Sequence, residues 1–327
     1  MRDQVFARRF DPQVNGAGGV SYTDEGLNLE KANAIADAYA ADQLATLITT
    51  SKERFLTNIA VVADMCDQRE DVRGIHLEGP FISPKAAGAH PKQFVLDPSI
   101  EIMRELLEAG RGHVSLVTVD PSGPRAHDLI KYLVDEGVTV SIGHTSSSKA
   151  QFWAGIEAGA TALTHVPNAW DKNSDARQEK EIFVPELASD PRVYPMMIAD
   201  RRHTSVAFVQ HVWAKAVGLE DRFVLVSDAS PLFNLPAGNY DTFDGLQVRV
   251  CGPNEVVPER EDVPRDGYPM TWPLSGSMHS LEDCLDSFAV DTGVRDPEVL
   301  GKVGGRNAFE MLRVPLLRSG KFPEELK

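Results

Sequence analysis

Short runs of β-branched and aliphatic residues alternate along the chain with stretches whose apolar positions recur at helical spacing. A continuous apolar run indicates a buried strand, and apolar residues every three or four positions indicate an amphipathic helix. Counted from Phe10, the pattern predicts eight strands, mostly separated by helices. The predicted strands are 9–15, 44–49, 72–77, 113–119, 138–142, 161–164, 194–198 and 223–226, and the longer predicted helices are 28–42, 52–66, 98–109, 124–136, 147–158, 205–217, 281–290 and 299–312.

This alternation predicts the fold class. Eight βα repeats with polar or ionisable residues after the strands are typical of an α/β protein with a (β/α)₈ barrel, the TIM barrel. A doubly wound open sheet is the alternative, but it brings distant strands to one point less readily. We expect one barrel domain over residues 1–327. A hairpin and a charged, proline-rich loop, at about 231–273, interrupt the repeat.

Composition narrows the class of protein. With 327 residues, of which 42% are hydrophobic, the chain can bury a barrel-sized core. A formal net charge of −15 argues against nucleic acid or an anionic membrane as a partner, since both require a basic face. No run is long enough to cross a bilayer and residues 1–4 lack the apolar core of a signal peptide, so we expect a cytoplasmic protein. The three cysteines form no CxxC pair, which argues against a disulfide framework or a thiolate metal site.

Four of the predicted strands are followed by a residue that could bind a metal or transfer a proton. Glu78 ends the third strand, and His144, His165 and Asp228 follow the fifth, sixth and eighth. The carboxyl ends of barrel strands meet at one mouth, so we expect the four side chains to converge there. Alone, Glu78 or Asp228 would often cap a turn or helix, and a lone histidine is more often a surface or core residue.

Two imidazoles and a carboxylate form a ligand set suited to Zn²⁺ or another first-row divalent ion, with one position left open for water. His144 and His165 are 21 residues apart, about one βα unit, so they are expected at the same height on adjacent strands. Asp228 could then act as a general base on a metal-activated water and afterwards as the acid that protonates a leaving group.

Several short segments, in this order, resemble one known family. They are His76–Phe81, Gly88–His90, Gly143–Thr145, Thr164–His165 with Asn168–Ala169, Asp200 with His203, and Ser227–Ala229. The chain is similar in these segments to the N-acetylglucosamine-6-phosphate deacetylases of the amidohydrolase superfamily. The run from His76 to Phe81 with its downstream Gly-Ala-His is the most specific part of the resemblance.

The resemblance implies a metal-dependent hydrolase that removes acetate from an N-acetylated amino sugar phosphate. It implies that Glu78, His144 and His165 hold one divalent ion, with zinc favoured and iron, manganese or cobalt as alternatives, and that Asp228 is the acid and base. Many superfamily relatives carry a His-x-His pair for a second metal where this chain has Gln13 and Asn15. Amides are poorer ligands, so we expect a single metal.

The resemblance also implies the substrate contacts. His90, next to Ala89, would polarise the acetyl carbonyl, Asn168 and Ala169 would meet the phosphate, and His203 would contact the sugar. Arg177 lies near the position of a phosphate-binding arginine that reaches across a dimer interface in the family, so a homodimer is expected. Solvated surface is an equal alternative for Arg177.

Departures from the family pattern leave the substrate open. Little of the family's accessory β-sandwich domain is expected here, and the chain reads Pro167-Asn168-Ala169-Trp170 and Asp200-Arg201-Arg202-His203 where relatives differ. Arg201 and Arg202 could supply another anion site or merely cover the barrel's rim. The alternatives are therefore an amidohydrolase for an unphosphorylated amino sugar or an N-acyl amino acid, and a non-catalytic sugar-binding barrel.

Overall fold

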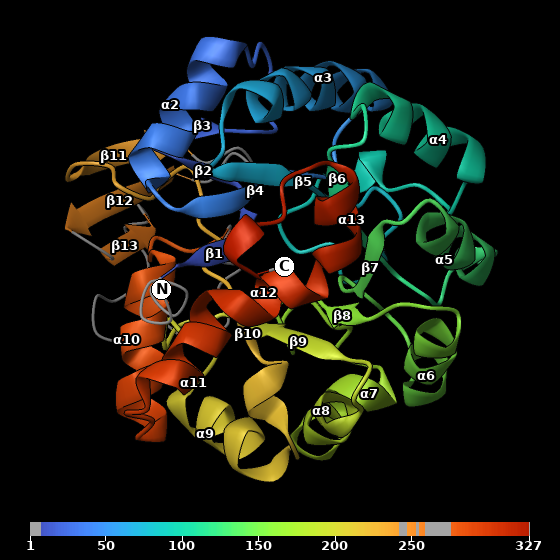
Figure 1. Ribbon diagram of the computed structural model, residues 1–327, viewed down its shortest axis with the longest axis vertical. Coiled ribbons are helices and arrows are strands. Elements are labelled where there is room, and N and C mark those ends of the chain that lie inside the picture. Colours follow the sequence, from blue (N-terminus) through green and yellow to red (C-terminus); the bar gives the residue numbers. More distant parts are fainter. Residues whose placement is uncertain (1–7, 242–246, 253–254, 259–275, 327) are drawn as a thin grey trace.

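The computed structural model of the protein describes residues 8–241, 247–252, 255–258 and 276–326. Eight parallel strands form a ring at its centre, and helices surround them (Figure 1). The strands follow the order β1-β4-β5-β6-β7-β8-β9-β10, so each pairs with the next barrel strand along the chain. This arrangement confirms the predicted (β/α)₈ barrel.

The strands and the surrounding helices lie close to where the sequence predicts them. The barrel strands are β1 (Phe10–Val14), β4 (Asp42–Ile48), β5 (Val72–Glu78), β6 (Val114–Val119), β7 (Thr139–Ile142), β8 (Ala162–Leu163), β9 (Tyr194–Met197) and β10 (Val224–Leu225). The helices are α2 (Leu29–Tyr39), α3 (Lys52–Gln68), α4 (Ile100–Ala109), α5 (Ala126–Asp135), α6 (Lys149–Glu157), α7 (Asp175–Gln178), α8 (Lys180–Ser189), α9 (Val206–Lys215) and α10 (Leu281–Thr292). None of the described helices is long and apolar enough to cross a membrane.

Serine residues define where several of these helices begin. Ser51, Ser99, Ser148, Ser205 and Ser280 each precede a helix, and each side-chain oxygen accepts a hydrogen bond from a backbone N–H of the first turn. Such caps satisfy N–H groups that have no partner inside the helix. They therefore set the length of the loops that join the strands to the helices.

The barrel closes between its first and last strands. The backbone N–H of Asn15 donates to the carbonyl of Ala229 at 2.8 Å, and Val14 and Ala229 form a parallel bridge. An open doubly wound sheet would leave these two edges unpaired. Closure instead brings the residues that follow β10 beside those that follow β1.

The helices near the carboxyl terminus cover the amino ends of the strands, and they cross the centre of the ring in Figure 1. These elements are α11 (Pro297–Gly301), the π-helical turn η3 (Lys302–Arg306), α12 (Asn307–Met311) and α13 (Arg313–Arg318). Phe309 stacks on Phe10, the first residue of β1, with ring centroids 4.4 Å apart. At the start of β7, the Thr139 hydroxyl donates to the carbonyl of Met311 at 3.2 Å. The loops that follow the strands therefore form the mouth at their carboxyl ends.

Two local predictions differ from the structure. The predicted helix over 299–312 is divided by η3, because the backbone passes so close to β1 that a Cβ on Gly305 would lie 2.2 Å from the carbonyl oxygen of Arg8. The glycine-rich stretch after the first strand is not only a loop. It contains a small antiparallel hairpin formed by β2 (Gly16–Ala17) and β3 (Val20–Ser21).

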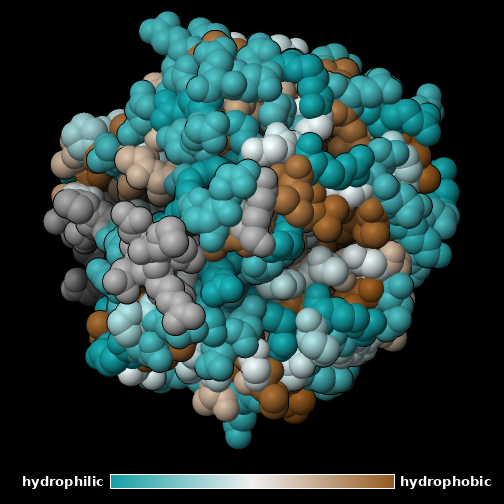
Figure 2. Space-filling view, in the orientation of Figure 1, coloured by the Kyte–Doolittle hydropathy of each residue, from teal (hydrophilic) through white to brown (hydrophobic). Residues whose placement is uncertain are grey.

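A second sheet lies in the predicted insertion. Strands β11 (Gly238–Asp241), β12 (Gln247–Gly252) and β13 (Glu255–Pro258) pair antiparallel. Three parts of the insertion, at 242–246, 253–254 and 259–273, lie outside the described residues. The division of the chain into one barrel with an insertion at 231–273 therefore stays a prediction. The molecule is shown space-filling in Figure 2, where polar residues cover much of the visible face.

Candidate active site

The structure brings Glu78, His144, His165 and Asp228 together at the mouth of the barrel. Glu78 is the last residue of β5, and the other three lie two or three residues beyond the ends of β7, β8 and β10. All four are buried. Their position at successive strand ends is where enzymes with this fold carry their reactive groups.

Three atoms that could coordinate a metal ion converge at the centre of this group. Oε1 of Glu78 lies 2.9 Å from Nε2 of His165 and 3.1 Å from Nε2 of His144. The two imidazole nitrogens are 3.2 Å apart. Ligand atoms about 2.1 Å from a four-coordinate ion are separated from one another by roughly 3.4 Å. The spacing of the three atoms therefore resembles one face of a metal coordination shell.

Hydrogen bonding on the far side of His144 strengthens this interpretation. Its Nδ1 lies 3.0 Å from the carbonyl oxygen of Ala86, which can only accept a hydrogen bond. Nδ1 therefore carries a proton, and Nε2 points at the carboxylate of Glu78. Two electron-rich atoms 3.1 Å apart need positive charge between them, which either a proton or a metal ion can supply. The donor set thus fits a divalent cation, and the bond to Ala86 orients the imidazole as metal-bound histidines usually require.

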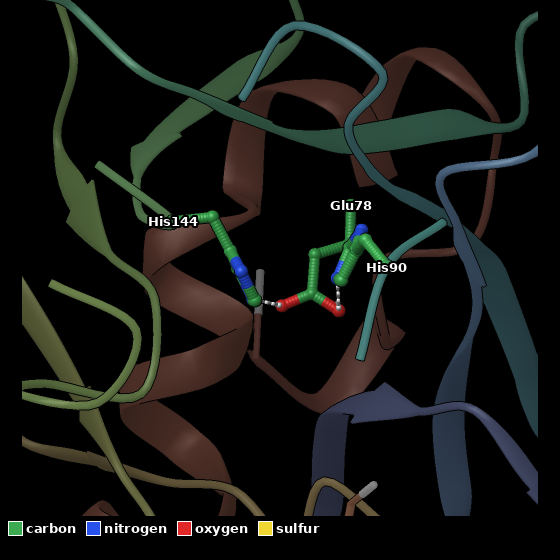
Figure 3. Close-up of side chains that lie close together, drawn as sticks. All are labelled: Glu78, His90 and His144. Atoms are coloured by element: carbon green, nitrogen blue, oxygen red, sulfur yellow. Dashed lines mark hydrogen bonds and ion pairs between the residues drawn. The ribbon is translucent and has the colours of Figure 1, made fainter. Parts of the chain in front are cut away.

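His90 approaches the same carboxylate from the other side (Figure 3). Its Nε2 is 3.7 Å from Oε2 of Glu78, and Glu78, His90 and His144 also form a group with potential ligand atoms within 4.8 Å of one another. The backbone N–H of Thr49, however, donates to Nδ1 of His90 at 3.2 Å. Nδ1 is thus the acceptor and Nε2 of the neutral ring carries the proton, so Nε2 can donate a hydrogen bond but cannot coordinate a metal. We therefore favour His165 over His90 as the third ligand.

Burial, assisted by the nearby His144, lowers the pKa of His90 to about 4. The imidazole is consequently neutral near pH 7. In the opposite sense, burial raises the pKa of Glu78, but the charge of His144 and hydrogen bonds from His144, His165 and His90 outweigh it and hold this pKa well below its usual range. The centre therefore combines a carboxylate anion with a neutral hydrogen-bond donor.

Two amides connect this centre to Asp228. The side-chain nitrogen of Gln13 donates to Oε1 of Glu78 and to Oδ1 of Asp228, both at 3.0 Å, and that of Asn15 donates to Oδ1 of Asp228 at 2.6 Å. Burial and the charge of Glu78 raise the pKa of Asp228 to about 6. A carboxyl group with such a pKa can accept and return a proton near neutral pH. Gln13 and Asn15 act here as hydrogen-bond donors.

A second histidine and carboxylate lie nearby in the mouth. Nδ1 of His203 is 2.6 Å from Oδ2 of Asp200. Burial opposes the charge on both groups, but their mutual attraction and hydrogen bond outweigh it. They lower the pKa of Asp200 to about 2 and raise the pKa of His203, which the charge of Asp228 also raises. The Nε2 of His203 has no hydrogen-bond partner among the described residues. It is therefore a donor left free for a ligand.

The remaining predicted contacts are less closely connected to the centre. Asn168 follows His165 in a turn, and its side-chain nitrogen is buried without a partner among the described residues. Arg177, in α7, donates to the carbonyl of Pro167, the residue before Asn168. Ala169 has a left-handed backbone, with φ of 51°. Ala89 is connected to the site only through the chain, as the residue before His90.

Arg201, one of two arginines considered for another anion site, has a partner on α10. Its guanidinium forms two hydrogen bonds with Asp291, at 2.8 and 3.0 Å. This pairing favours the interpretation in which Arg201 covers the rim of the barrel. Sequence reasoning also missed Thr49, which orients His90. The signal that could have found it is a polar Thr-Thr pair at the end of a predicted strand.

Backbone strain is concentrated at the site. His144, His165 and Asp228 have φ values of 45°, 29° and 54°, in the left-handed region that side chains other than glycine rarely adopt. Their neighbours hold them there: the N–H of Ser83 donates to the carbonyl of His144 at 2.8 Å, and that of Ser277 to the carbonyl of Asp228 at 2.7 Å. Backbone strain of this kind is common at functional sites, where it helps to preorganise the side chains.

Comparison with known proteins shows to which family the chain belongs. No protein-family model matches it. It is 30% identical over 307 residues to the N-acetylglucosamine-6-phosphate deacetylase of Danio rerio, covering 89% of this chain and 71% of that enzyme. The chain belongs to the N-acetylglucosamine-6-phosphate deacetylase family. The enzyme of that name from Bacillus subtilis is 32% identical over 182 residues, which cover 56% of this chain but only 44% of that enzyme.

Solved structures of this deacetylase family share the fold. A variant of the N-acetyl-D-glucosamine-6-phosphate deacetylase of Mycobacterium smegmatis, in complex with N-acetyl-D-glucosamine-6-phosphate, superposes with a TM-score of 0.78 at 26% identity. The match covers 94% of this chain and 77% of that one. A curated N-acetylgalactosamine-6-phosphate deacetylase from Escherichia coli O157:H7 is also similar, at 26% identity over 247 residues, which cover 74% of this chain and 64% of that enzyme.

Proposed function

We propose that the protein hydrolyses the acetamide of an N-acetylated amino sugar phosphate, and that N-acetylglucosamine 6-phosphate is converted to glucosamine 6-phosphate and acetate. The observation that carries this proposal is the convergence of Glu78, His144 and His165 donor atoms within 3.2 Å, beside the buried Asp228. The relatives that carry the deacetylase name support the choice of substrate.

Glu78, His144 and His165 would hold one divalent ion, with zinc favoured over iron, manganese or cobalt. A bound ion of this kind lowers the pKa of a coordinated water to about 7 and polarises a carbonyl oxygen. Gln13 and Asn15 direct N–H groups, not lone pairs, at Asp228 and Glu78. This hydrogen bonding supports a single ion.

The chain's own groups divide the remaining work. Asp228 would accept a proton from the attacking water and return it to the departing nitrogen, for which a pKa of about 6 is suitable. His90, neutral and with its proton on Nε2, would donate to the acetyl oxygen as negative charge develops there. His203 would donate its free N–H to a sugar hydroxyl.

The phosphate would lie beyond His165. Asn168 offers a buried, unpartnered amide nitrogen and Arg177 a guanidinium whose described hydrogen bond is to a neutral carbonyl. Among the described residues, Arg177 has no carboxylate within ion-pair distance, although Glu181 is close enough to act on its charge. An arginine without an ion-pair partner is suited to binding an anion. A homodimer remains the expected assembly, and its interface the expected place for further phosphate contacts.

An acetate-release assay with metal-loaded protein tests the proposal. The substrates to compare are N-acetylglucosamine 6-phosphate, its galactosamine isomer, unphosphorylated N-acetylglucosamine and a panel of N-acetyl amino acids. We expect a strong preference for a phosphorylated sugar. Activity on N-acetyl amino acids alone would replace the substrate while keeping the mechanism, and no activity in metal-loaded protein would favour the sugar-binding barrel.

The ligand set has its own test, in a matched pair of histidine variants. His165→Asn is expected to remove the ion, because it deletes the ring nitrogen that lies 2.9 Å from Oε1 of Glu78. His90→Asn should keep the ion, because Nε2 of His90 carries a proton, yet lower kcat by about 10²-fold through loss of a donor to the acetyl oxygen. Metal content per chain, measured by mass spectrometry of the purified proteins, decides between them. Loss of metal in His90→Asn but not in His165→Asn would reverse the assignment.

A further inference from the structure

A buried carboxylate lies at the seam where β1 meets the end of β10. Asp11 is fully buried, and its described contacts are all hydrogen-bond donors. The backbone N–H groups of Gln13 and Ser227 donate to its two oxygens, each at 3.1 Å. The hydroxyl of Tyr39 donates to the same oxygen as Ser227. Asp11 thus connects the two strands that close the barrel.

Tyr39 extends this connection to two helices. It is the last residue of α2, and its hydroxyl also accepts the backbone N–H of Leu281, the first residue of α10, at 3.1 Å. The Ser227 hydroxyl lies 2.9 Å from the same oxygen. It also accepts the N–H of Ala229 at 3.0 Å. The two sides of Asp228 are therefore held by one buried cluster of polar groups.

The cluster controls two residues of the proposed mechanism. Asp11 binds the backbone of Gln13, whose side chain contacts Asp228, and the backbone of Ser227, which precedes Asp228. Asp228 itself has a left-handed backbone, which needs external support. A shift of either strand along the seam would separate Nε2 of Gln13 from Oδ1 of Asp228.

We infer that Asp11 and Tyr39 are positioning residues that hold Asp228 and Gln13 in register across the barrel seam. The inference rests on the proposed function, in which Asp228 transfers the proton. Burying a carboxylate costs free energy unless hydrogen bonds satisfy it. The hydrogen bonds of Asp11 also fix the position of Asp228, because Asp228 follows Ser227, a backbone partner of Asp11.

The test compares two tyrosine-to-phenylalanine variants. Tyr39→Phe removes the hydroxyl that donates to Asp11, whereas Tyr22→Phe removes another buried hydroxyl, which donates to Gln43 of β4 at 3.0 Å, on the side of β1 opposite the β10 seam. We expect Tyr39→Phe to lower kcat by about tenfold or more, with KM and metal content unchanged, as is usual when a supporting hydrogen bond is lost. Tyr22→Phe should keep the kcat of the wild type. Asp11→Asn is a second seam variant, and Tyr39→Phe suffices if it does not fold.

A double variant separates positioning from general stability. In an Asp228→Asn background, Tyr39→Phe should no longer lower kcat, because the group it positions is gone. An unchanged kcat in the single variant, or the same loss in both backgrounds, would overturn the inference.

If the wild type releases no acetate, the proposed function fails, and crystal structures of the wild type and Tyr39→Phe test the inference separately. A longer distance between Gln13 and Asp228 in Tyr39→Phe would support the inference, and an unchanged distance would overturn it. The same two structures test the inference if the double variant is too slow for its kcat to be measured.

Discussion

The two ends of the barrel differ in what their residues do. At the carboxyl end, buried charges and strained backbone surround Glu78, and electron-rich atoms of Glu78, His144 and His165 lie 3.1 to 3.2 Å apart. At the amino end, Phe10 and Phe309 stack in an apolar contact beneath α12. The first arrangement is costly unless a ligand completes it, whereas the second needs nothing further. Chemistry and stability are thus assigned to opposite ends of the same strands, as is general for this fold.

The largest expected effect is at the carboxyl end. Asp228→Asn should lower kcat by about 10³- to 10⁴-fold, because the amide cannot carry the proton from water to the leaving nitrogen. The metal content and the unfolding midpoint should change little, since Asn keeps the hydrogen bond to Gln13 through its oxygen. Steady-state acetate release and metal analysis measure both. A variant that turns over at the wild-type rate would remove Asp228 from the mechanism.

The opposite result is expected at the amino end. Phe309→Ala should lower the free energy of unfolding by about 3 to 5 kcal/mol, since it leaves a cavity against Phe10 and Phe322. At temperatures well below the new midpoint, kcat should stay near its wild-type value. Urea unfolding and acetate release on the same preparation provide the two numbers. A large loss of kcat in folded protein would show that the two ends are coupled.

A smaller effect would show that the carboxyl end also contributes to stability. The Asp200 pKa is lowered to about 2, so its stabilisation is present above pH 4 and lost as pH falls toward 2. The His203 pKa is raised, so its stabilisation is present below about pH 6.5 and lost as pH rises through the folded-state value. His203→Asn should therefore cost about 2 kcal/mol near pH 5 and less at pH 2 or pH 9.

Urea unfolding at these three pH values measures the effect. His113→Asn is the control, because His113 pairs with Asp67, whose side chain is 55% exposed, and this solvent-screened pair should contribute below about 1 kcal/mol. A cost for His203→Asn that does not depend on pH would show that packing, not charge, holds the pair.

The barrel and the convergence of the four site residues could be predicted because parallel strands share an edge. Alternating apolar runs locate the strands, and any residue just beyond a strand then lies at the mouth. Gly79, Gly143 and the polar residues beside them mark these ends in the sequence. The regular repeat thus carries the position of a residue, although not the direction of its side chain.

Contacts between distant segments decide the direction. The backbone N–H of Thr49, which lies 41 residues before His90, determines which of its ring nitrogens accepts a hydrogen bond. Arg201 is paired with Asp291, 90 residues later. The turn of His144 depends on a left-handed φ at a residue other than glycine, which propensity disfavours. No pattern of hydrophobic and polar positions contains these relations.

The double attachment of His144 has an evolutionary consequence. Its backbone carbonyl accepts from Ser83 at 2.8 Å and its Nδ1 faces the carbonyl of Ala86 at 3.0 Å, so the two ends of the segment 83–86 are bound to one residue, at its backbone and at its imidazole. The attachments use backbone atoms of that segment and are indifferent to most of its side chains. Over generations, the segment can therefore drift in composition, but a single inserted or deleted residue would turn the imidazole away from Glu78. We expect its length to be more constant among homologues than its residues.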